Sequence, residues 1–278
     1  MLDLSKVVEG FLDPIARIVE AMRDQVAEID PHQVMLVGAW CRDTLHAALG
    51  HSFSTSGTRD VDLALALSGW EIYERLSHAF PSAGDSGVGF QIAGLVVDLL
   101  PFGELEDPRG SIKPPTRGDS ISVWAFAEIF QDSSLLPLGP SLAIRCPTVP
   151  GYTAAKLAAW LDRSEWGEAK DANDLALSLF WYVESKQVEG RLYETQDGQQ
   201  ILLAEEADVP RAAARLLGRD VSAMVGPDRS TELIQRWPGD VDMLVRNLTL
   251  RTGPRWLAPR DRRQEVVDAL TRGLADSS

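Results

Sequence analysis

Two aspartates one residue apart lie inside an apolar run, Arg59-Asp-Val-Asp-Leu-Ala-Leu65. In a β-strand successive side chains point to opposite faces, so Asp60 and Asp62 would project to one side while Val61 and Leu63 enter the core. Two carboxylates this close repel each other unless a cation neutralises them, and Mg²⁺ prefers hard oxygen ligands of this kind. The run therefore predicts a strand with a metal-binding face. The alternative is a solvent-facing strand edge without function.

A short apolar run at 32–37 precedes Gly38, and a helical stretch follows at 44–49. This order predicts a strand, a glycine turn and a helix. A glycine at such a turn allows a bulky ligand to approach the backbone, and the first amides of a helix favour a phosphate. We therefore expect Gly38 to lie beside a bound nucleotide.

Asp98 is the only charged residue in the stretch 86–103, and it lies in the second strand of a predicted β-hairpin, 89–93 and 95–100. Burial of a lone carboxylate among apolar side chains costs several kcal/mol unless the group is paired or bound to a metal. We predict that Asp98 is a third metal ligand. The alternative is that it lies at the exposed end of its strand.

Two predicted amphipathic helices carry further candidates, Lys156 on the first and Asp171 and Asp174 on the second. A lysine on a largely apolar helix face normally extends its ammonium to water. A lysine aimed into a phosphate site instead acts as a point charge on the triphosphate. The surroundings of Lys156 in the sequence leave both interpretations open.

In this order the motifs resemble those of the nucleotidyltransferase superfamily related to DNA polymerase β. The segment Val37-Gly-Ala-Trp-Cys-Arg-Asp43 is similar to the opening motif of CCA-adding enzymes and poly(A) polymerases. Lys156 and the segment Lys170-Asp-Ala-Asn-Asp-Leu175 resemble the pattern of AbiEii-type toxin nucleotidyltransferases, which include the MenT group. The likeness extends over residues 33–182.

The predicted fold class is α/β (α+β), with a nucleotidyltransferase core of a mixed sheet and flanking helices, plus a helical C-terminal region. The predicted domains are 1–186 for the nucleotidyltransferase domain and 187–278 for the helical region. Helical periodicity continues beyond 187, and the stretch 211–218 is typical of a helix that ends at its glycine, Gly218.

The resemblance implies that Asp60, Asp62 and Asp98 hold Mg²⁺, with Mn²⁺ as a possible substitute, and that an NTP is the substrate. An acceptor hydroxyl would attack the α-phosphorus in line and expel pyrophosphate, with Asp98 able to accept the hydroxyl proton. Lys156 and Arg42 would neutralise phosphate charge. The protein would contribute position and charge stabilisation rather than covalent chemistry.

Two further residues follow from the same resemblance. Asp171 would orient Lys156 or a nucleotide hydroxyl. Ala39 departs from the family pattern, which has Gly or Ser there, so a hydroxyl contact to the triphosphate is missing. Backbone amides or Arg42 would have to supply that contact, and a catalytically silent nucleotide-binding protein is an alternative.

The acceptor implied by the resemblance to AbiEii-type toxins is the 3′ end of tRNA. The protein would then be the toxin of a toxin–antitoxin or phage-defence system, with an antitoxin protein as its partner. An adenylyltransferase that acts on a small hydroxyl compound or on a protein is the alternative.

The net charge of −14 predicts long-range repulsion of nucleic acid. Residues 186–278 are nearly neutral, with 14 Lys and Arg against 15 Asp and Glu. Arginines there surround one tryptophan, and the candidates for gripping a phosphate backbone and stacking on a base are Arg251, Arg255, Trp256 and Arg260. The alternative is a solvated surface whose arginines pair with acidic residues.

Other features predict a cytoplasmic protein without membrane contact. No run of 18 apolar residues is present, and the N-terminus lacks a basic region followed by an apolar stretch. Cys41 and Cys146 are too few for a disulfide framework or a zinc site.

Overall fold

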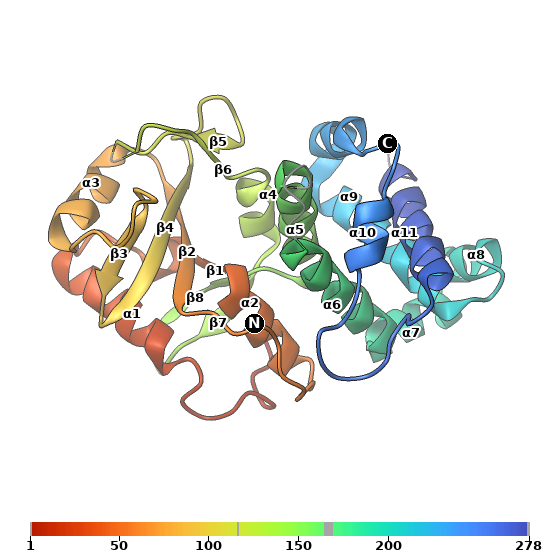
Figure 1. The fold of residues 1–278 in the computed structure, drawn as a ribbon. Coiled ribbons are helices and arrows are strands. Elements are labelled where there is room, and N and C mark those ends of the chain that lie inside the picture. The colour runs from red at the N-terminus through yellow and green to blue at the C-terminus, as the bar shows by residue number, and fades with distance from the viewer. Residues whose placement is uncertain (1, 116, 164–168, 277–278) are drawn as a thin grey trace. The chain divides into compact units, whose positions relative to one another are not determined.

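The computed structural model describes residues 2–115, 117–163 and 169–276, and the chain divides into two compact units (Figure 1). The first, which we call the sheet unit, contains residues 1–52 and 56–148. The second, the helical unit, contains residues 53–55 and 149–278.

A mixed six-stranded sheet forms the centre of the sheet unit. Its strands are, in spatial order, β3 (Gly89–Ile92), β4 (Leu95–Gly103), β2 (Asp60–Leu67), β1 (Val34–Val37), β8 (Ala143–Cys146) and β7 (Ser134–Pro137). β2 runs parallel to β4 and antiparallel to β1, and β8 runs parallel to β1. The predicted α/β class with a mixed sheet is therefore confirmed.

β2 lies between β4 and β1, and its composition fits that place. Residues Leu63, Ala64 and Leu65 are buried on both faces, as expected for a central strand covered by helices. Asp60 and Asp62, at the first end of the strand, are partly exposed. The strand thus passes from a polar, accessible end into the core.

Helices flank this sheet, and a two-stranded sheet accompanies it. The helical elements are α1 (Asp13–Gln25), the 3₁₀ turn η1 (Pro31–Gln33), α2 (Gly38–Ala48), α3 (Trp70–Ala79) and α4 (Phe126–Asp132), and the small sheet pairs β5 (Ser111–Ile112) with β6 (Ile121–Ser122). α1 packs on α3 and β3, whereas α2 packs on β1 and β2.

The helix expected to begin at Thr44 begins six residues earlier, at Gly38. Gly38 has φ +64°, so the chain turns from strand to helix within one residue instead of through a loop. Ala39, Cys41 and Arg42 are buried within the first helical turns. The segment predicted as a turn is thus a packed helix start.

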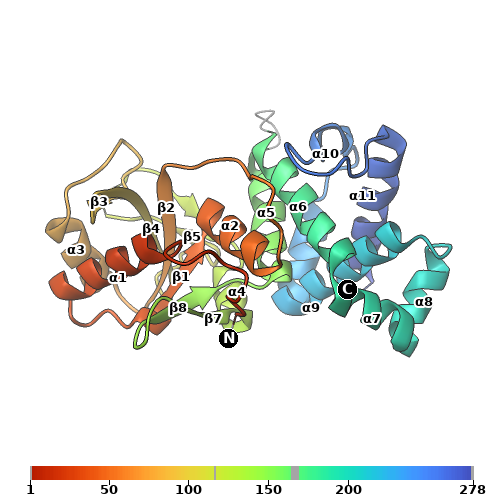
Figure 2. The same ribbon diagram turned by 90° about the horizontal axis from the view of Figure 1, so that it is seen from below.

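The helical unit contains seven helices within residues 149–163 and 169–276 (Figure 2). They are α5 (Val149–Arg163), α6 (Lys170–Glu184), α7 (Lys186–Glu194), α8 (Gln196–Ala204), α9 (Val209–Arg236), α10 (Asp242–Asn247) and α11 (Arg260–Ala275). No helix in the described part of the chain is long and apolar enough to cross a membrane.

The two compact units divide the chain earlier than the predicted domain boundary between 186 and 187. α5 and α6, which the sequence analysis assigned to the first domain, both pack against α9 in the helical unit. The division therefore falls between Thr148 and Val149. The candidates on α5 and α6 consequently belong to a different unit from Asp60, Asp62 and Asp98.

The helix expected to end at Gly218 continues through it, and α9 breaks only at Gly226, which has non-helical φ and ψ. A Cβ on Gly218 would lie 2.3 Å from the carbonyl oxygen of Leu270 in α11. The glycine therefore permits close approach of two helix backbones rather than ending a helix. A sequence pattern does not distinguish these two uses of glycine.

Candidate metal centre

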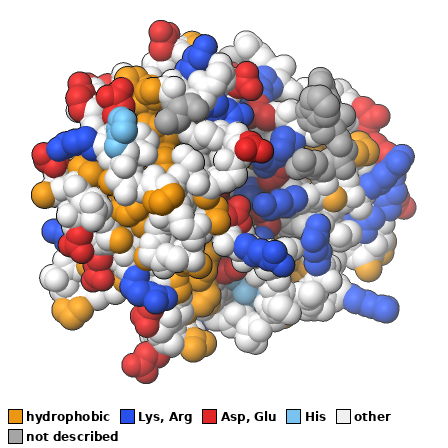
Figure 3. Space-filling model, turned by 60° about the vertical axis from the view of Figure 1, so that its left-hand side comes forward, with side chains coloured by type: hydrophobic (Ala, Val, Ile, Leu, Met, Phe, Trp, Pro, Cys, Tyr) orange, Lys and Arg blue, Asp and Glu red, His pale blue; other side chains and the backbone are white. Residues whose placement is uncertain are grey.

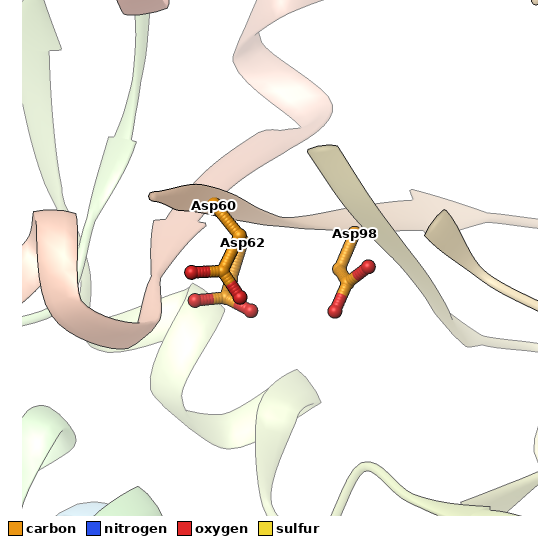
Figure 4. A group of neighbouring side chains, drawn as sticks. All are labelled: Asp60, Asp62 and Asp98. Carbon is orange, nitrogen blue, oxygen red and sulfur yellow. The ribbon is translucent and has the colours of Figure 1, made fainter. Parts of the chain in front are cut away.

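Asp60, Asp62 and Asp98 lie together on one face of the sheet, on the adjacent strands β2 and β4 (Figure 4). Asp60 and Asp62 project from the same face of β2, as the alternation predicted. β4 runs parallel to β2 with Asp98 in register with Asp62, so Asp98 lies on the neighbouring strand beside them. One carboxylate oxygen from each residue lies within 4.8 Å of the others. The predicted convergence of the three acids, which we call the triad, is confirmed.

The three carboxylates repel one another, and this repulsion contributes to a raised pKa of Asp98. Burial raises the pKa of Asp98 most, the charges of Asp62 and Asp60 raise it further, and together they bring it to about 6. The ionised triad is therefore unfavourable on its own. A divalent cation bound to these oxygens would stabilise the ionised triad, because it favours the charged form of every ligand.

The donor set fits a hard divalent cation. All three ligands are carboxylates, which suit Mg²⁺ and Mn²⁺ better than the softer metals that prefer sulfur or imidazole. None of the three side chains is fully buried, so each retains access to solvent and to a substrate.

Gly38 makes room for Asp62. A Cβ on Gly38 would lie 1.9 Å from Oδ2 of Asp62, closer than any real contact. Val37, directly before the glycine, pairs with Asp62 across the antiparallel strands β1 and β2. The space that a Cβ of Gly38 would fill is thus taken by a carboxylate of the triad, and contact of Gly38 with a nucleotide stays a prediction.

Two residues beside the triad were missed by the sequence analysis. The hydroxyl of Thr58 donates a hydrogen bond to Oδ1 of Asp60. A Cβ on Gly89, which pairs with Asp98, would lie 3.0 Å from Oδ1 of that aspartate. The signal for Thr58 was its place two residues before Asp60. Gly89 could be found only once the hairpin register was known.

Arg42 occupies a different environment from the one predicted. Its side chain is 1% exposed, and Nε donates to Oδ1 of Asp43 at 2.8 Å. Its Nη2 donates to the carbonyl oxygen of Ser56. The guanidinium thus holds the chain before β2 in place, and contact with a triphosphate would require it to leave these partners.

Lys156 and Asp171 meet in the helical unit, together with Asp174. Nζ of Lys156 lies 2.6 Å from Oδ2 of Asp174 and 3.5 Å from Oδ1 of Asp171. Arg163 donates to the other oxygen of Asp171 from Nε and Nη2, at 2.9 and 2.6 Å. Asp174 is therefore the closer partner of the lysine. Binding of a triphosphate by Lys156 stays a prediction.

The proposed nucleic-acid residues are partly engaged within the helical unit. Nε of Arg251 donates to Oδ1 of Asn173 at 2.7 Å, and Arg260 forms an ion pair with Asp242. Trp256 packs edge-on against Phe180, with ring centroids 6.0 Å apart. Arg255 is exposed. Arg260 thus fits the alternative interpretation, in which the arginines pair with acidic residues.

One face of the molecule shows the same mixture at larger scale. Several lysine and arginine side chains lie near one another in this view, with aspartate and glutamate side chains between them (Figure 3). A mixed surface of this kind attracts a phosphate backbone less than a uniform basic patch would.

No protein-family model matches the chain, and no curated protein is significantly similar to it in sequence. An assignment of function accordingly depends on the geometry of the triad and on the order of the motifs.

The raised pKa of Asp98 predicts how stability depends on pH in the absence of metal. The folded pKa of about 6 lies above the ordinary value of 3.8, so the ionised group destabilises the fold above pH 6 and protonation relieves this between pH 6 and 4. We expect Asp98→Asn to raise the melting temperature in EDTA at pH 7.5 by about 2–4 °C, on the order of 1 kcal/mol after solvent screening.

The difference in melting temperature between Asp98→Asn and the wild type should shrink as the pH falls from 7 to 5, and differential scanning fluorimetry measures it. A difference that stays constant over this range would contradict the assignment of the raised pKa to Asp98.

Proposed function

We propose that this protein is a divalent-metal-dependent nucleotidyltransferase that transfers a nucleoside monophosphate from an NTP to an acceptor hydroxyl. The observation that supports this most is the convergence of Asp60, Asp62 and Asp98 on adjacent strands, within 4.8 Å of one another. A mixed sheet with a helix that starts at a glycine directly after β1 is compatible with the nucleotidyltransferase fold that the motifs imply.

Asp60, Asp62 and Asp98 would hold the cations. When bound, Mg²⁺ or Mn²⁺ would neutralise charge on the triphosphate and on the pyrophosphate that leaves. In the transfer, the acceptor oxygen forms a bond to the α-phosphorus, and the bond from that phosphorus to the pyrophosphate oxygen breaks. Asp98 would accept the proton of the acceptor hydroxyl, because its raised pKa makes it a stronger base than an ordinary aspartate.

The resemblance also implies a phosphate contact from Lys156, on α5 of the helical unit. Lys156 is buried between Asp174 and Asp171, so its charge is held at a fixed place on α5. A triphosphate would compete with these carboxylates for the ammonium. Asp171 would then keep the lysine oriented, while Arg163 keeps Asp171 in place.

The 3′ end of tRNA is the acceptor that the motif order favours, and the protein would then be a cytoplasmic toxin held inactive by an antitoxin. A small hydroxyl compound and a protein side chain are the other acceptors. Ala39, which carries no hydroxyl for the triphosphate, is the feature that favours a silent nucleotide-binding protein.

The proposal is tested by incubating the full chain with each α-labelled NTP in turn, Mg²⁺ or Mn²⁺, and total RNA or total protein. We expect label from one NTP to enter RNA of tRNA size at the 3′ end, where mild 3′ exonuclease treatment removes it. Label in protein or in a small molecule would move the acceptor to those classes. Absence of label from every acceptor would contradict the proposed transferase activity and favour a catalytically silent nucleotide-binding protein.

A further inference from the structure

The chain leaves the sheet unit for three residues just before β2. Residues up to Ser52 belong to the sheet unit, Phe53–Thr55 pack with the helical unit, and Ser56 returns to the sheet unit. We call residues 53–60 the strap. Apart from the passage between Thr148 and Val149, the strap is where the chain crosses between the two units.

One end of the strap is anchored in the helical unit by an aromatic side chain. The ring of Phe53 packs edge-on against Phe180 of α6, with centroids 5.7 Å apart. Gly253 leaves space for this ring, since a Cβ there would lie 2.6 Å from it. The hydroxyl of Thr252 donates to the carbonyl oxygen of Ser54.

The other end of the strap is anchored at the triad. The carbonyl oxygen of Ser56 accepts from the buried guanidinium of Arg42, which is fixed in turn by Asp43. Two residues later the hydroxyl of Thr58 donates to the carboxylate of Asp60. A carboxylate whose orientation is set by a neighbouring donor binds metal with less loss of freedom, and outer partners of this kind tune metal affinity.

The two anchors, Phe53 and Ser56, are three residues apart in the chain. Three residues of extended chain span at most about 11 Å, so Phe53 and Ser56 cannot move independently over larger distances. A displacement of Phe53 therefore pulls on the segment that ends at Thr58 and Asp60. Phe53 does not need to touch the triad to affect it.

We propose that the strap couples the helical unit to the triad and that Phe53 is a positioning residue for the metal site. This inference rests on the proposed function only in taking the triad as a metal site. Its consequence is that packing in the helical unit around Phe180 sets how firmly Asp60 is held. A ligand that rearranged the helical unit could thereby change metal affinity through the strap.

The test compares three variants of the full chain. Phe53→Ala removes the ring, Phe53→Leu keeps an apolar anchor, and Leu270→Ala opens a cavity between α11 and α9 away from the strap. Mn²⁺ affinity is measured by titration calorimetry. Hydrogen–deuterium exchange of peptides covering 56–62 is measured without metal, so that the strap is observed independently of the metal.

We expect Phe53→Ala to weaken Mn²⁺ binding about tenfold, the low end of the cost of losing outer support of a metal ligand, and to speed exchange at 56–62. Phe53→Leu should keep most of the wild-type Mn²⁺ affinity and most of the wild-type protection from exchange at 56–62. Leu270→Ala should lower the melting temperature but change neither Mn²⁺ affinity nor exchange at 56–62.

If Phe53→Ala kept wild-type Mn²⁺ affinity and wild-type exchange at 56–62, the proposed role of Phe53 would be wrong. It would also be wrong if Leu270→Ala caused equal changes, because these would reflect a general loss of stability. If the wild type binds no Mn²⁺, the metal site and the proposed function fail. The exchange comparison then still decides whether Phe53 holds residues 56–62.

Discussion

Asp62→Asn is expected to lower nucleotide transfer by at least about a thousandfold while the protein stays folded. Asparagine keeps the shape that fits beside Gly38 but removes the charge that a divalent cation needs from its ligand. Loss of a cation that neutralises the triphosphate costs several kcal/mol of transition-state stabilisation, and a thousandfold corresponds to about 4 kcal/mol. The measurement is incorporation of label from the preferred NTP under single-turnover conditions.

The fold should tolerate this change because the triad is a site of repulsion. Removing the charge of Asp62 removes one of the causes that raise the pKa of Asp98, so the melting temperature without metal should not fall. Asp24→Asn is a matched control, because it makes the same change at an exposed position of α1. Transfer by Asp62→Asn at the rate of Asp24→Asn would exclude the triad as the catalytic metal site.

The triad could be predicted from the sequence because strand geometry and solvation act on single residues. Alternation within 59–65 placed Asp60 and Asp62 on one face, and the cost of burying Asp98 alone indicated that it had partners. The parallel register of β2 and β4 then brought Asp62 and Asp98 together. The first two steps needed only local sequence pattern, whereas the register of β2 and β4 came from the structure.

Other features depend on contacts between distant segments, and no local pattern reveals these. Arg42 is buried, and its guanidinium donates to the carbonyl oxygen of Ser56, 14 residues further along the chain. Cys41 and Cys146, treated as isolated in the sequence, are both buried, and their sulfur atoms lie 3.9 Å apart. Gly218 was taken for a helix end because its partner, Leu270, is 52 residues away.

Gly38→Ala is expected to destabilise the protein by about 2–5 kcal/mol and to abolish metal binding. The residue has φ +64°, which costs a side-chain-bearing residue about 1–2 kcal/mol. The added Cβ would also lie 1.9 Å from Oδ2 of Asp62, so the carboxylate or the start of α2 must move. Displacement of a buried or half-buried contact of this kind adds about 1–3 kcal/mol. Chemical denaturation measures the first effect and Mn²⁺ titration the second.

Gly94→Ala separates the two causes. Gly94 has φ +82° at the turn between β3 and β4, but a Cβ there would meet no atom within 4 Å. The control therefore includes the backbone strain without the collision, and it should cost about 1–2 kcal/mol and leave Mn²⁺ affinity unchanged. Equal losses in the two variants would mean that Asp62 is not fixed against Gly38. A larger loss in Gly38→Ala, accompanied by loss of Mn²⁺ binding, would show that this glycine leaves space for the carboxylate of a metal ligand rather than acting as a hinge for the chain.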